Sequence, residues 1–106
     1  MPTLDRDEFL RQIAQVYESG DENPEIGPFA LNGVVLENER LHCLVFNACQ
    51  MKDVAFIRCD LRGSDLSRCS MSHVLLFACM VNGLSLPSGA NAILVDCSDT
   101  ACVSAE

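Results

Sequence analysis

A large apolar side chain recurs at every fifth position through more than half of this chain, and this spacing restricts the possible folds severely. An α-helix spaces apolar residues by three and four, and a simple strand spaces them by two, so neither explains a period of five. The central series, counted in steps of five, has twelve members: Leu31, Leu36, Leu41, Phe46, Met51, Phe56, Leu61, Leu66, Met71, Leu76, Val81 and Leu86.

A second series lies two residues before the first, and it is mostly small or apolar. The alternation of two and three predicts very short extended segments, each directing two side chains inward, separated by turns. Stacked coils of this kind form a solenoid whose inward side chains make columns. The preceding series is Phe29, Val34, Glu39, Leu44, Cys49, Val54, Cys59, Ser64, Cys69, Val74, Cys79 and Leu84, in which only Glu39 is charged.

The blocks CDLRG (59–63) and SDLSR (64–68) resemble the A(D/N)LXX motif of the pentapeptide repeat family almost letter for letter. The resemblance extends over about residues 29–104. It implies an all-β solenoid, a right-handed quadrilateral β-helix with four pentapeptides in each coil, so that residues 20 apart stack. The sequence agrees with this step, because columns of like residues result: Val34, Val54 and Val74; Leu36, Phe56 and Leu76; Cys49 and Cys69; Cys59 and Cys79.

The repeat loses its phase at Pro87–Gly89. We expect it to resume one residue later, through a bulge of a single residue. This predicts about 3.75 coils and a stack ~18 Å tall at the ~4.8 Å spacing of strands. The expected central residues are then Ala92, Cys97 and Cys102, preceded by Ala90, Val95 and Thr100.

The chain divides into an amphipathic helix with its linker (1–27) and the β-helix (28–106). Asp5 and Glu8 have the spacing of a capping box, and Leu4 with Phe9 has that of a hydrophobic staple. Ser19-Gly20 predicts the helix end. Because so short a helix is marginal alone, it must pack on something, either the open top of the solenoid or an apolar outer face.

The net charge of −8 is concentrated at the two ends of the chain. Residues 1–27 carry −5, residues 28–88 carry 0 and residues 89–106 carry −3. Without a basic patch, direct nucleic-acid binding is not expected. The apolar runs are shorter than the ~20 residues that span a bilayer, and we see no secretory signal. Seven cysteines, an odd number, favour a reducing compartment, so we expect a cytoplasmic protein with no membrane contact.

No grouping of side chains predicts catalysis, a metal site or a cofactor. The cysteines lack metal-ligand spacing and are expected to be reduced core thiols. His42 and His73 fall on outward positions without clustered partners, and Ser64 belongs to no Ser/His/Asp grouping. Glu39 is the unusual residue, because it occupies an inward position. Either an open first coil lets it reach water or Arg40, or it marks a specific site.

One outer wall is unexpectedly apolar and is the candidate surface for helix docking, self-association or a partner. Its residues flank the inward valine and leucine columns and stand beside Glu37: Val35, Ala55, Ile57, Leu75 and Phe77.

Two functions remain open. The first is a non-enzymatic interaction module that binds a protein partner or a second copy of itself. The second is implied by the family resemblance: some members mimic DNA, bind DNA gyrase or topoisomerase IV, and confer quinolone resistance. A stack of ~18 Å covers about half of the ~34 Å turn of DNA, and its wall is neutral, so the second hypothesis is the weaker one.

Overall fold

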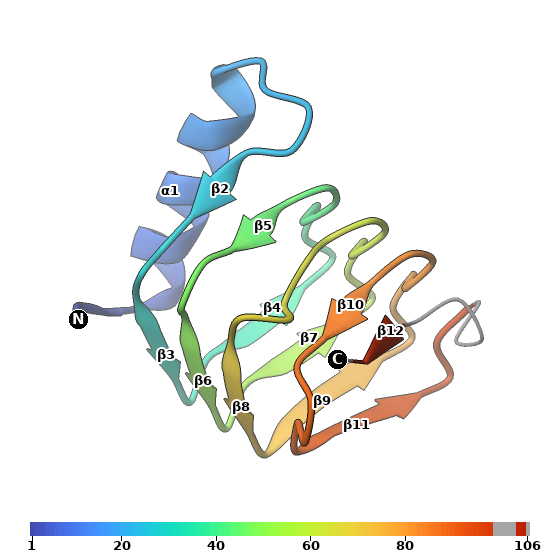
Figure 1. The fold of residues 1–106 in the computed structure, drawn as a ribbon. Coiled ribbons are helices and arrows are strands. Elements are labelled where there is room, and N and C mark those ends of the chain that lie inside the picture. The colour runs from blue at the N-terminus through green and yellow to red at the C-terminus, as the bar shows by residue number, and fades with distance from the viewer. Residues whose placement is uncertain (99–103, 106) are drawn as a thin grey trace.

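The computed structural model describes residues 1–98 and 104–105, and shows strands stacked as a β-solenoid of about four turns with one N-terminal helix (Figure 1). The elements are β1 (Thr3–Leu4), α1 (Arg6–Glu18), β2 (Glu25–Ile26), β3 (Ala30–Asn32), β4 (Val35–Glu37), β5 (Val45–Phe46), β6 (Gln50–Lys52), β7 (Ala55–Ile57), β8 (Ser70–Ser72), β9 (Val74–Phe77), β10 (Ser85–Leu86), β11 (Ala92–Val95) and β12 (Ser104–Ala105).

All strand pairs are parallel, and they build columns along the solenoid axis. One sheet has the order β1-β3-β6-β8, and a second has the order β11-β9-β7-β4. In a third column β2 pairs with β5, and β10 pairs with β12, with Asp65 bridging between them. A fourth column consists of isolated bridges through Arg40, Asp60, Met80 and Ser98. The regular coils advance by 20 residues, as the register of β4, β7 and β9 shows.

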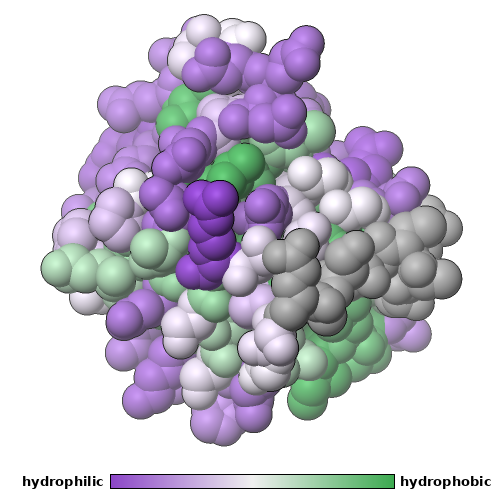
Figure 2. All heavy atoms as spheres, viewed as in Figure 1, coloured by the Kyte–Doolittle hydropathy of each residue, from purple (hydrophilic) through white to green (hydrophobic). Residues whose placement is uncertain are grey.

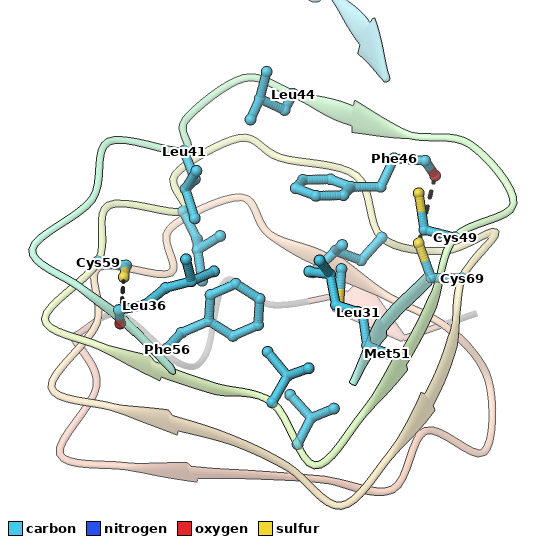
Figure 3. Close-up of a cluster of buried hydrophobic side chains, with 14 of the residues drawn as sticks. Leu31, Leu36, Leu41, Leu44, Phe46, Cys49, Met51, Phe56, Cys59 and Cys69 are labelled. Atoms are coloured by element: carbon cyan, nitrogen blue, oxygen red, sulfur yellow. Dashed lines mark hydrogen bonds between the residues drawn. The ribbon is translucent and has the colours of Figure 1, made fainter. Parts of the chain in front are cut away.

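The inward positions form the core as the period of five predicts. Every member of the central series from Leu31 to Leu86 is buried, and so is every member of the preceding series except Glu39. Figure 3 shows part of this core, with Leu36, Phe46 and Phe56 among the side chains that point into the coil. Phe56, for example, lies fully buried between Leu36 above it and Leu76 below it.

The corners of the coil depend on a left-handed residue two positions after most central residues. Gly33, Gly63 and Gly83 supply it without strain, and at Gly83 a side chain would also meet the Gly63 backbone at 3.5 Å. Residues with side chains take the same conformation at other corners: Asn38, Cys43, Ala48, Asp53, Arg58, His73, Ala78 and Asp96.

The phase that the sequence predicts for the repeat after Leu86 is wrong. Leu94 stacks on Leu76 and Ala92 on Val74, so the last coil is two residues shorter than the regular ones instead of one residue longer. The left-handed Asp96, two residues after Leu94, confirms that Leu94 is central.

The physical reason is a short turn in place of a strand. The Ala90 amide donates to the Pro87 carbonyl at 3.2 Å, and Gly89 supplies a φ of 71°, so the chain turns directly beneath β8. Consequently Val95 points outward, and Cys97 takes the position that Cys79 holds one coil earlier. The expected positions of Thr100 and Cys102 lie outside the described residues.

The helix α1 closes the first coil, which decides between the two packing sites left open by the sequence. The capping box between Asp5 and Glu8 is present. Phe9 is fully buried, with its ring 5.6 Å from that of Phe29 and 6.4 Å from that of Phe46. On either side of the helix, β1 extends the column of β3 and β2 extends that of β5. In the described part of the chain, no helix is long and apolar enough to cross a membrane.

Candidate interaction surface

The outer side of the sheet β4-β7-β9-β11, which we call the apolar face, carries two columns of hydrophobic side chains. In the first column Val35, Ala55 and Leu75 stack in register, and Ile93 of β11 continues them. Ile93 is 63% exposed, the highest value in the column. The column is therefore a continuous apolar stripe along the solenoid axis, and in Figure 2 hydrophobic atoms gather over β11 at the lower right.

The second column runs parallel to the first and begins with a charge. Glu37 stands at its start, followed by Ile57, Phe77 and Val95 in register. Phe77 and Val95 keep more than a third of their surfaces exposed. The structure thus brings together all five predicted residues and adds two that the sequence analysis missed. Ile93 and Val95 were missed because the wrong phase placed Val95 inward; the apolar residues that alternate with Leu94 were the available signal.

Nothing in the described part of the chain covers this face. The predicted alternative that α1 lies on it is wrong, because α1 packs over the open end of the coil. The apolar side chains therefore remain exposed or partly exposed to solvent.

Polar side chains form the rim of the apolar face. Arg58 approaches Glu37 at 3.7 Å, and His73 approaches Asp53 at 3.6 Å. The side chains of Arg58 and Glu37 are both 54% exposed, so their attraction is screened and contributes little to stability. An apolar centre with a charged margin is the usual anatomy of a protein interface.

The acidic residue Asp60 lies on a different column and pairs within its own turn. Its backbone stacks beneath that of Arg40, as the 20-residue step predicts, but its carboxylate accepts two hydrogen bonds from Arg62, at 2.9 and 2.8 Å. These bonds hold the pKa of Asp60 below its usual range. The pair orders the turn and leaves little charge for a ligand.

Glu39 and the two histidines have no shared partner among the described residues. Glu39 is partly exposed, so it reaches water as one of the two alternatives predicts, although α1 closes the first coil. It lines a shallow cavity of about 290 Å³ with Arg40 and Arg58. His73 is exposed on the rim. His42 is outward but covered, because the Tyr17 ring stacks on it at a centroid distance of 5.3 Å.

Tyr17 fixes the end of α1 to the coil. Its hydroxyl donates to the His42 carbonyl at 2.7 Å, and burial raises the pKa of Tyr17 to about 12. The Nδ1 atom of His42 is buried beneath it without a hydrogen-bond partner in the part of the chain that the structure describes. The contact therefore explains the docking of the helix rather than any chemistry.

The cysteines act as packing residues whose thiols bond to the coil above. Cys59 donates to the Leu36 carbonyl at 3.3 Å, and Cys79 donates to the Phe56 carbonyl at 3.2 Å. The neighbouring Cys59 thiol, together with burial, raises the pKa of the Cys79 thiol far above its ordinary value. All six cysteines of the described residues are free, as predicted, whereas Cys102 lies outside that part.

Ser64 plays the same packing role with a hydroxyl. It is buried, donates to the Leu41 carbonyl and accepts from the Leu44 amide at 3.1 Å. The Ser64 hydroxyl thus acts both as a donor and as an acceptor, in each case toward the backbone. Across residues 1–98 and 104–105, no three His, Cys, Asp or Glu side chains gather in a way that could hold a metal ion.

Comparison with family models, with curated proteins and with solved structures gives no match to this chain. Membership of the pentapeptide repeat family therefore stays a prediction from the repeat itself.

Proposed function

We propose that this chain is a non-enzymatic pentapeptide-repeat protein, wound as a right-handed quadrilateral coil in the cytoplasm, that binds another protein through the apolar face. The observation that carries this proposal is the double column of seven exposed or half-exposed apolar residues on β4, β7, β9 and β11. A continuous apolar stripe of this kind is a candidate binding site, because covering it removes apolar area from water.

The size of the face indicates the kind of complex. Four strands ~4.8 Å apart and three residues ~3.3 Å apart, with their side chains, give an area of about 250 Å². Two copies meeting face to face would bury about 500 Å² in total, less than half of the ~1,200 Å² that specific stable complexes need. The apolar face alone is therefore too small for a stable complex, so a partner must also contact the polar rim.

The dimensions also favour this function over mimicry of DNA. The protein measures 30 × 27 × 25 Å, so it lacks the elongation of a rod that could imitate more than about one ~34 Å turn. The regular coils between residues 28 and 88 carry no net charge, which removes the electrostatic basis of such mimicry.

The test is affinity capture from the native host with wild-type protein and the Phe77→Asp variant, using Ser70→Asp on the exposed side of β8 as the matched control. We expect Phe77→Asp to lose a partner that wild type and Ser70→Asp retain, while light scattering shows a monomer. Equal retention by all three proteins would contradict the proposal. If the wild-type protein is instead a dimer and Phe77→Asp is a monomer, the apolar face binds a second copy of the chain.

A further inference from the structure

In the part of the chain that the structure describes, the N-terminal segment contacts the outer edge of the first coil on three of its four columns. The strand β1 pairs above β3, and β2 pairs above β5. On the column of isolated bridges, Tyr17 donates to the His42 carbonyl. The remaining column ends at β4, whose neighbour in the described chain is β7 alone. One strand edge of the first coil thus lacks the covering that the N-terminal segment provides elsewhere.

The free edge of β4 presents backbone groups in a known pattern. The Val34 carbonyl accepts from the first residue of β7 at 3.0 Å, and the Asn38 amide donates to its last residue at 2.9 Å. In a parallel ladder alternate residues direct their groups to the same neighbour. Val34, Leu36 and Asn38 therefore face β7, whereas Val35 and Glu37 direct their N–H and C=O groups away from it. An unpaired edge of this kind is a template for an added strand.

A groove lies directly at this edge. Its volume is about 390 Å³, within the range of ligand sites, and it is lined by Arg6, Val35, Glu37 and Asn38. Glu37 already faces Arg58. Arg6, at the start of α1, is exposed and makes no ion pair with any residue that the structure describes. Of the two charged side chains that line the groove, Arg6 is therefore the one without a partner among the described residues, although the chain as a whole carries −8.

We propose that the β4 edge binds an extended, acidic peptide segment of a partner protein as an added strand. The segment places an outward residue above Val35, a small residue above the fully buried Leu36, and an acidic side chain against Arg6. Two of the other three columns are covered by extended backbone, in β1 and β2, so the same geometry suits the column of β4. The inference does not depend on the apolar face.

A second folded copy does not fit the edge. The helix α1 lies over the same end of the solenoid and is about 10 Å thick, whereas an added strand must lie ~4.8 Å from β4. The helices of two copies would meet before their edges could pair. A single peptide strand needs only the groove beside β4 that Arg6, Val35, Glu37 and Asn38 line.

The experiment uses the full chain labelled with ¹⁵N and the synthetic peptide Thr-Asp-Val-Ala-Thr-Asp-Thr. In the free protein the Val35 and Glu37 amides should exchange with solvent faster than the Leu36 amide. Titration with the peptide should shift both amides saturably and slow their exchange at least tenfold. A matched peptide with N-methyl groups on the alanine and on the second aspartate lacks the N–H groups that face Val35 and Glu37, so it should bind at least tenfold more weakly.

Protein variants then distinguish binding at the β4 edge from binding elsewhere on the surface. Arg6→Gln should weaken binding about tenfold, which corresponds to about 1.4 kcal/mol for a lost charge-assisted contact, whereas Arg11→Gln on the same helix should leave it unchanged. Phe77→Asp should also leave peptide binding unchanged. The experiment therefore distinguishes a wrong proposal for the apolar face from a wrong proposal for the β4 edge. The proposal is overturned if the peptide gives no saturable shift at millimolar concentration, if the N-methylated peptide binds equally, or if the shifts centre on Leu75 and Phe77.

Discussion

Truncation of a single core phenylalanine should show how strongly the coil depends on its inward columns. In Phe56→Ala, the ring that fills the space between Leu36 and Leu76 is removed, and all three side chains are fully buried. The lost transfer free energy is about 2 kcal/mol. A residual cavity of about 80–100 Å³, at about 24 cal/mol per Å³, adds about 2 kcal/mol. Relaxation is restricted because the coils above and below hold the neighbouring backbone in register.

The expected cost to the free energy of unfolding is therefore about 4 kcal/mol, or a fall of roughly 15–25 °C in Tm for a domain of this size. Equilibrium urea denaturation followed by circular dichroism measures it. Phe77→Ala is the matched control, since the same side chain is removed from an outward position that is 36% exposed, and it should cost less than half as much. Equal losses for the two variants would refute the assignment of inward and outward positions.

Three further predictions concern separate contacts. Ser64→Ala should cost about 1–3 kcal/mol in urea denaturation, because it leaves the buried Leu41 carbonyl and Leu44 amide without their partner; a loss below about 0.5 kcal/mol would contradict this. Arg58→Ala should change stability by at most about 1 kcal/mol, because its contact with Glu37 is exposed, and a larger loss would show that the rim is structural. Deletion of the N-terminal segment through the end of α1 should expose the first coil and cause aggregation on size exclusion, and a monodisperse product would show that the helix is dispensable.

The sequence predicted the regular coils well, because a solenoid requires the same chemistry at every stacked position. The phase between Leu31 and Leu86 leaves no alternative: any shift by one residue would bury charges in several coils at once. The apolar face followed from the same phase. Its residues alternate with inward ones, so the repeat alone places Val35 and Phe77 on the outside of the coil.

The sequence could not fix the last coil, because the segment from Ala90 to Cys97 is apolar or small in more than one phase. The pairing of β11 with β9 decides it, and pairing depends on how the turn at Pro87 closes. The position of α1 was open for a similar reason. Its apolar stripe is compatible with either the coil end or the outer face, and the fit of Phe9 between two core rings decides it. The free edge of β4 is a property of tertiary pairing that no local pattern reveals.

Methyl and amide NOE spectroscopy tests the coil directly, because it detects which residues stack. We expect contacts at a step of 20 residues between Leu36 and Phe56, and at a step of 18 residues between Leu76 and Leu94. Absence of contacts between Leu76 and Leu94, or between Leu36 and Phe56, would contradict the stacked coil described above.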